Sequence, residues 1–257
     1  MTMNYKEVSQ RLSKEEAARY ATGIQQMADL ADSLQKQGLL PVRFGARESL
    51  PTLEQLVLRP RFTDRERKKL LADKAKAYLL SRTTILQQKE ARAAKGQPSF
   101  WHITDGGDRL LALPSRDIEV AFFPDPNRFF VEGTFGKDTN TQERLVRAAG
   151  QTLGNRLGLP NIAGIITDEA ATWSDLTYQY LDDPEGGEWL FGPKYAEAVG
   201  KSWVYARTKN PTNASGSDVA HVGLASPGRG LGISGWDRAS GHGGGGAPLL
   251  VVPIENK

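Results

Sequence analysis

Apolar residues recur every three or four positions in two stretches of the first hundred residues. Between residues 13 and 37 this spacing is bounded by a capping-box pattern at its start and a glycine after its end, and it predicts a helix. A second helix is predicted from Thr63-Asp64 to about residue 94, where many Lys and Arg residues separate the apolar positions. The prolines between residues 39 and 60 predict an extended or irregular connection.

Beyond Gly96–Pro98 the pattern changes to short runs of β-branched and aromatic residues. Strands are predicted over 101–104, 109–113, 118–123, 129–134, 203–207, 221–225, 231–236 and 249–254. Two helices interrupt them, over 141–157 with Asn140 or Thr141 as its cap, and over 168–181 with Thr167 as its cap. The chain is therefore expected to be α+β, with a helical N-terminal region, 1–96, followed by a domain of short, loop-rich antiparallel strands, 97–257.

Charge and composition narrow the function classes. The first hundred residues carry 19 Lys and Arg against 11 Asp and Glu, and the remainder is mildly acidic. The absence of cysteine excludes disulfides, thiolate metal sites and cysteine nucleophiles. No apolar run is long enough to cross a bilayer, and the polar N-terminus does not resemble a secretory signal. We expect no membrane association, and a protein that is cytoplasmic or released as part of a virion.

The residues that suggest chemistry have ordinary structural explanations. The three histidines, His102, His221 and His242, lack metal-ligand spacing. The glycine-rich runs 228–232 and 243–246 lack the Gly-Lys-Ser/Thr ending and a following helix, which excludes a phosphate loop. The acidic run 182–185 fits a calcium loop or, more simply, a turn. Asp168 and Glu169 suit a helix start. No catalytic, metal or cofactor site is expected.

Three segments and their order suggest a family. They are Ile166–Trp173 at a helix start, Ser202–Thr208 in a strand and Pro248–Pro253 in a closing apolar strand. Over about the last 120 residues this order resembles the C-type-lectin fold of formylglycine-generating-enzyme-like domains and of variable proteins of diversity-generating retroelements. The enzymes act through cysteine, which this chain lacks. The resemblance therefore implies the ligand-binding use of the fold.

In the variable proteins, adenine mutagenesis of AAC or AAT codons diversifies a segment near the C-terminus. Such changes cannot produce Lys, Glu, Gln, Met or Trp. Residues 214–253 contain no Lys, Glu, Gln or Met, although Lys and Glu are frequent elsewhere. A flexible glycine-rich loop explains this composition equally well.

Within this segment, alternation separates a framework from a display surface. The residues expected to be buried are Val222, Leu224, Ile233, Leu250 and Val252. The ligand-binding residues are expected to be Ser226, Arg229, Ser234, Asp237, Arg238, Ser240 and His242, gathered in one exposed patch. Trp173 and Trp236 are predicted to be framework residues.

The predicted function is non-catalytic recognition of a macromolecular ligand, with a protein as the favoured partner. One alternative is a structural phage or virion component. Another is a nucleic-acid-binding protein that uses the basic helix 64–94, although nucleic acid is the less favoured partner. The N-terminal helices are candidates for homo-oligomerisation.

Overall fold

The computed structural model describes residues 57–104 and 107–255. The chain divides into two units, Met1–Ser49 and Leu50–Lys257, and every described residue belongs to the second. The helix predicted over 13–37, with its role in oligomerisation, lies outside the described residues. The predicted division between residues 96 and 97 does not coincide with the division between the units.

One sheet combines strands from both sides of residue 96. Its members are β1 (Val57–Leu58), β2 (Lys76–Leu79), β4 (Glu119–Phe122), β5 (Ile162–Ile165) and β10 (Leu250–Glu255). The strand order is β1-β10-β4-β2, β5 also pairs with β10, and every pairing is antiparallel. A fragment that began at residue 97 would therefore lack two strands of this sheet.

The second sheet carries most of the C-terminal segment. Its order is β3 (Phe100–Ile103), β8 (Gly230–Asp237), β7 (Asp218–Ser226), β6 (Tyr205–Pro211) and β9 (Gly245–Gly246). β6, β7 and β8 are antiparallel, as predicted. The edge strands β3 and β9 instead run parallel to their neighbours, which corrects the expectation of antiparallel strands only.

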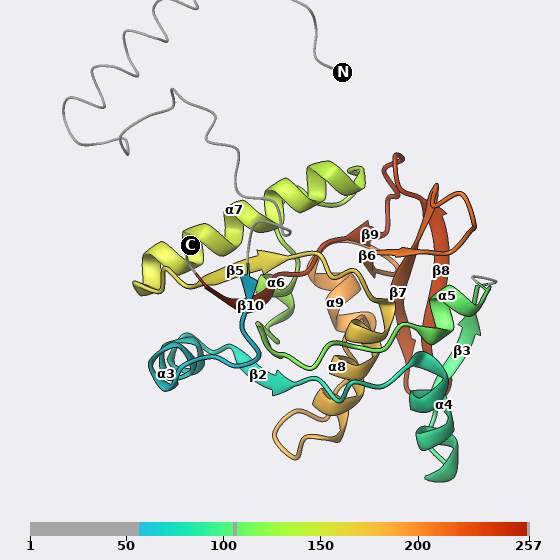
Figure 1. Cartoon of the computed structure of the whole chain (residues 1–257). Coiled ribbons are helices and arrows are strands. Elements are labelled where there is room, and N and C mark those ends of the chain that lie inside the picture. Colours follow the sequence, from blue (N-terminus) through green and yellow to red (C-terminus); the bar gives the residue numbers. More distant parts are fainter. Residues whose placement is uncertain (1–56, 105–106, 256–257) are drawn as a thin grey trace, which may run out of the picture. The chain divides into compact units, whose positions relative to one another are not determined.

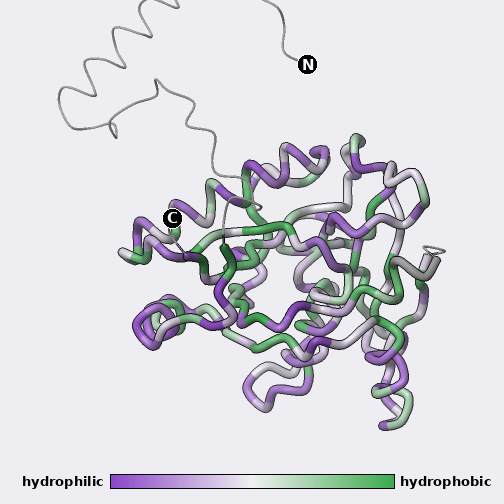
Figure 2. The backbone as a smooth tube through the Cα atoms, viewed as in Figure 1, coloured by the Kyte–Doolittle hydropathy of each residue, from purple (hydrophilic) through white to green (hydrophobic). Residues whose placement is uncertain are grey.

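Helices separate and cover the sheets (Figure 1). α8 (Ala170–Asp182) lies between them, and α7 (Thr139–Leu157) lies along β5. The approach of α7 depends on glycine, because a Cβ at Gly150 would lie 2.1 Å from the backbone nitrogen of Gly164. The shorter helices are α3 (Asp64–Ala72), α4 (Ile85–Ala94), α5 (Gly107–Ala112), α6 (Pro126–Phe129) and α9 (Pro193–Ala198). Figure 2 shows hydrophobic residues concentrated on β5 and β10, whereas α3 is largely hydrophilic.

Aromatic rings fill the core around Phe129. Its ring lies 4.8 to 6.1 Å, centroid to centroid, from those of Phe122, Phe130, Trp173, Phe191 and Tyr195, all at the steep angles that aromatic pairs favour. Trp173, on α8, is 1% exposed, which confirms that it is a framework residue.

The mixed α+β class is confirmed, and so are both central helices. The N-cap of α7 is Asp138, whose carboxylate accepts from the backbone nitrogen of Thr141 (3.0 Å), and its C-cap is Gly158, which adopts the left-handed conformation. The N-cap of α8 is Glu169, which makes no side-chain capping hydrogen bond, so Thr167 is not the capping residue.

The single helix predicted over 63–94 is wrong. This range forms α3, β2 and α4, and positive φ angles at Lys74 (70°) and Arg82 (53°) break the helical path on either side of β2. Thr63 and Glu66 form a capping box that starts α3, and Thr84 and Gln87 form a second one that starts α4. A continuous basic helix over 64–94 therefore does not exist in the described structure.

Two predicted strands are also wrong. Residues 109–113 fall largely in α5, because a short apolar run fits a buried helical turn as well as a strand. Of residues 129–134, Phe129 ends α6, a single turn that Asp125 caps and Pro126 begins, and Phe130 makes only an isolated bridge with Pro248. Within the part of the chain described here, no helix is long and apolar enough to span a bilayer.

Replacing Trp173 with Ala is expected to reduce the free energy of unfolding by about 3–5 kcal/mol, because it empties a fully packed aromatic site. Denaturant unfolding of the full chain measures the change. Trp101→Ala is the matched control: Trp101 is 40% exposed, and its loss should cost markedly less. Equal costs for the two variants would contradict the central place of Trp173 in the core.

Candidate ligand-binding surface

The second sheet has one apolar and one polar, aromatic face. Directly opposed residues on neighbouring strands share a face. Arg207 opposes His221, His221 opposes Ser234, and Tyr205 and Trp236 follow two residues away on their strands. The other face carries Val204, Ala206, Ala220, Val222 and Ile233, all buried in the core cluster that contains α8. The polar, aromatic face is covered by residues 237–244, which we call the 237–244 loop.

A buried cation holds this loop. Arg207 is 1% exposed, and its guanidinium donates hydrogen bonds to oxygens from two segments of the chain. The acceptors are Thr139 Oγ1 (2.9 Å) and the backbone oxygens of Ser240 (2.9 Å), Arg238 (3.3 Å), Lys137 (3.3 Å) and Asp237 (3.4 Å). No carboxylate of the described residues lies within ion-pair distance of Arg207. Burial lowers the pKa of Arg207, against the opposing charges of Asp138 and Asp237.

Further bonds reach the loop through its backbone. The nitrogen and Oγ1 of Thr139 both donate to the oxygen of Arg238 (3.0 and 2.9 Å), whose own nitrogen donates to Ser217 O (2.8 Å). The nitrogen of Gly136 donates to His242 O (3.3 Å). The conformation of the loop is therefore fixed mainly by contacts that do not depend on its exposed side chains.

Five rings pack beneath and beside the loop. His242 stacks on Trp236 with 3.8 Å between centroids and 6° between planes. Trp203, Tyr205 and His221 lie 4.5 to 6.1 Å from Trp236. Trp236 and His242 are half-buried, so Trp236 is part of the framework only along one side.

His221 is fully buried in this cluster. Its Nδ1 lies 3.1 Å from the oxygen of Val219 and donates to it, which leaves Nε2 as an unprotonated acceptor without a partner among the described residues. Burial lowers the pKa of His221 to about 3, and the charge of Arg207 adds to the effect. His242 has its pKa lowered by the same two causes.

The seven predicted ligand-binding residues are all exposed or half-buried, but they form two groups. Ser226 and Arg229 flank the turn between β7 and β8, whereas the residues from Asp237 to His242 lie beyond the opposite end of β8. The seven residue steps of β8 separate the two ends by about 23 Å. Ser234 lies between them, within the strand. The predicted framework residues Val222, Ile233, Leu250 and Val252 are buried, and Leu224 is half-buried.

Some of these residues also stabilise the structure. The Asp237 carboxylate accepts hydrogen bonds from the nitrogen of Ala239 (2.8 Å) and from Ser240 Oγ (3.0 Å), and the first of these lowers its pKa most. His242 stacks on Trp236. Arg229 and Arg238, in contrast, are exposed and make no side-chain hydrogen bond or ion pair with a described residue.

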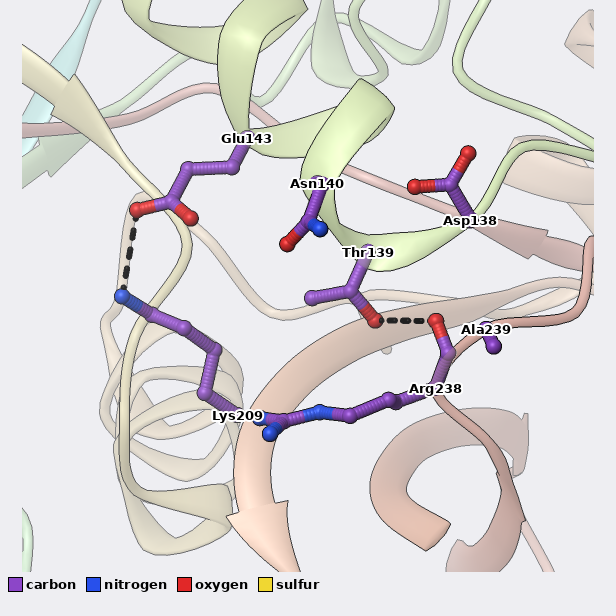
Figure 3. A pocket seen from close by; sticks show the side chains of 7 residues that line it. All are labelled: Asp138, Thr139, Asn140, Glu143, Lys209, Arg238 and Ala239. Atoms are coloured by element: carbon purple, nitrogen blue, oxygen red, sulfur yellow. Dashed lines mark hydrogen bonds and ion pairs between the residues drawn. The ribbon is translucent and has the colours of Figure 1, made fainter. Parts of the chain in front are cut away.

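A pocket of about 430 Å³ opens beside the 237–244 loop (Figure 3). Arg238 and Ala239 contribute one wall, the first turns of α7 the other, and Lys209 of β6 lies between them. The ammonium of Lys209 pairs with Glu143 and with Asp168, at 3.2 Å from each. A second pocket, of about 410 Å³, includes Trp189, Pro193 and Pro227, next to the other group of predicted residues.

The other candidate constellations are accounted for by internal pairing. Asp168 and Glu169 both pair with Arg116. In the acidic run 182–185, Asp182 pairs with Arg92 and Glu185 with Lys76, which favours the turn over a calcium loop. No group of three or more His, Asp or Glu side chains in the described ranges is arranged to hold a metal ion.

Comparisons with protein-family models, with curated proteins and with solved structures find no match to this chain. The functional argument therefore rests on the geometry of the loop, its anchoring residue and the adjoining pocket.

Replacing Arg207 with Met should lower the free energy of unfolding by about 2–4 kcal/mol, because several backbone oxygens lose a buried donor. Amide hydrogen exchange should accelerate most within residues 237–244. Arg229→Met is the matched control, since it removes an exposed guanidinium and should change stability by less than about 0.5 kcal/mol. An equal effect of both substitutions would exclude Arg207 as the anchor.

Lowering the pH below about 6.5 should reduce the free energy of unfolding because of His221. Its folded pKa, about 3, is below the ordinary value of 6.5, so the unfolded chain binds one more proton between these limits. The contribution is fully present above pH 6.5 and declines on acidification by about 1.4 kcal/mol per unit within the window. Urea unfolding between pH 7 and 4 measures this slope, which His221→Gln should make shallower by that amount. An unchanged slope would show that His221 does not titrate on unfolding.

Proposed function

We propose that this chain is a non-catalytic ligand-binding display protein, in which a C-type-lectin-like unit presents a diversifiable surface formed by residues from about 214 to 253. The order of elements supports the proposal. A long helix, α7, is followed by β5 and α8, then by the antiparallel strands β6, β7 and β8, and then by β10, which returns to pair with β5.

The observation that carries the proposal is how the 237–244 loop is held. Arg207 and Thr139 bind its backbone oxygens, while the side chains of Arg238, Ala239 and Ser240 are exposed. A loop fixed through its backbone keeps its shape when its exposed side chains change. That property is what a surface requires if it is to present different residues on one scaffold.

The composition of the segment supports the same function. It lacks Lys, Glu, Gln and Met, and Arg207, which holds the loop, lies outside it.

The ion-paired carboxylates Asp168 and Glu169 are bound by Arg116 and do not form a free acid–base pair. A protein is the favoured ligand, because the two groups of predicted residues lie at opposite ends of β8, about 23 Å apart.

Most substitutions at residues 238–240 should leave the protein folded. A library randomised at these three positions should give variants whose Tm remains within a few degrees of the parent, because exposed substitutions shift stability by under about 0.5 kcal/mol. A matched library at the buried positions Thr139, Arg207 and His221 should yield few folded members. Equal folded fractions in the two libraries would remove the basis of the proposal.

Natural variation tests the biological role directly. Deep sequencing of the gene in a population that carries it should find adenine-directed changes concentrated between codons 214 and 253 and absent from codon 207. A neighbouring reverse transcriptase gene and a near-copy of the 3′ coding segment should accompany them. Variation at the same rate in codons 57–104 would contradict a diversified surface.

A further inference from the structure

Most charges that line the pocket in Figure 3 are satisfied within the protein. The Asp138 carboxylate caps α7, accepting from the nitrogen (3.0 Å) and Oγ1 (2.7 Å) of Thr141. Glu143 pairs with Lys209 and with Arg147, and Lys209 pairs also with Asp168. These groups keep little capacity to bind an added ion, and Asp138 already occupies the start of the helix.

Arg238 is different. Its guanidinium has no acidic partner among the described residues, yet its backbone is fixed by Ser217 on one side and Thr139 on the other. Asn140, exposed in the first turn of α7, makes no side-chain hydrogen bond within the described structure, and Figure 3 shows its amide directed into the same pocket. The Arg238 guanidinium, a permanent cation, and the Asn140 amide, which makes no side-chain hydrogen bond within the described structure, thus line one cavity. Both residues have a backbone that is held by hydrogen bonds.

We propose that this pocket binds a carboxylate group of the ligand through the guanidinium of Arg238 and the side-chain amide of Asn140. A guanidinium offers two parallel N–H donors that match the two oxygens of a carboxylate, and the Asn amide offers a further donor. The pocket volume, about 430 Å³, lies in the range of small-ligand sites. This inference rests on the proposed function, because it names the chemical group that the display surface recognises.

The nearby carboxylates make the site selective for charge. Asp138 and Glu143 line the same pocket as Lys209 and Arg238, so the lining has no net positive charge that would offset the greater desolvation cost of a dianion. A carboxylate should therefore bind more tightly than phosphate. An acidic side chain of a protein ligand satisfies this requirement, and so does a free small carboxylate.

NMR titration of the full-length protein tests the site with three probes: acetate, the tripeptide Gly-Glu-Gly and inorganic phosphate. Acetate and the peptide should each cause saturable shifts in the Arg238 Nε–H and Asn140 amide signals, with phosphate weaker than either. Arg238→Gln should weaken binding at least about tenfold, whereas Arg229→Gln, which removes an exposed arginine outside this pocket, should leave it unchanged. Tighter binding of the peptide than of acetate would assign the site to a protein ligand, and equal binding to a free carboxylate.

Two results would overturn the inference. One is a linear, unsaturated shift that is equal at Arg229 and Arg238, which would indicate unspecific ion binding. The other is tighter binding of phosphate than of acetate. Neither would affect the sequencing test of the display function, so the two proposals fail independently.

Discussion

A buried guanidinium, without a carboxylate partner among the described residues, is the constraint on which the polar half of this fold depends. Removing Arg207 from water is costly, and backbone oxygens with the hydroxyl of Thr139 offset that cost. The oxygens come from residues 137 and 237–240, so the same cation ties the start of α7 to the end of β8. The loop and the helix start, which border the pocket, are held together by this cation and by the hydrogen bonds of Thr139 to the oxygen of Arg238.

The same cation fixes the chemistry of its neighbours. His221 opposes Arg207 across β6 and β7, and a second positive charge there would meet both burial and repulsion. The imidazole therefore stays neutral and packs as an aromatic ring between Trp236 and Gly245. His221 and His242 thus belong to an aromatic cluster, and on the described part of this face the groups left to contact a ligand are those of the loop and its borders.

Hydrophobic periodicity, apolar runs and capping residues predicted the helices and strands that depend mainly on neighbouring residues in the sequence. α7 has an amphipathic period and a terminal glycine, and β6, β7, β8 and β10 have alternation or apolar runs. The prediction of one helix over 63–94 was wrong because Lys74 and Arg82, where the backbone turns, are themselves basic residues of high helix propensity and do not interrupt the sequence pattern. The capping box at Thr84 was readable in the sequence and would have placed the start of α4.

The site was less predictable, because its parts are far apart in the chain. Arg207 contacts Thr139, 68 residues earlier, and Lys209 contacts Glu143, 66 residues earlier. Nothing in the local pattern around either basic residue indicates such a partner. Alternation predicted that the seven residues would not be buried, but it does not reveal their division into two groups, which follows from the length of β8.

That length also limits what the surface can recognise. A ligand that contacts both Arg229 and Arg238 must extend over about 23 Å, which requires a macromolecule. A small molecule would engage only one end, at the pocket beside Arg238 or at the apolar pocket beside Pro227. The two ends differ in chemistry: one is charged and hydrogen-bonding, and the other is mainly apolar, with Trp189 and two prolines beside the ion pair of Lys194 and Glu188. A single partner that used both would present an acidic group and an apolar group separated by about the length of one strand.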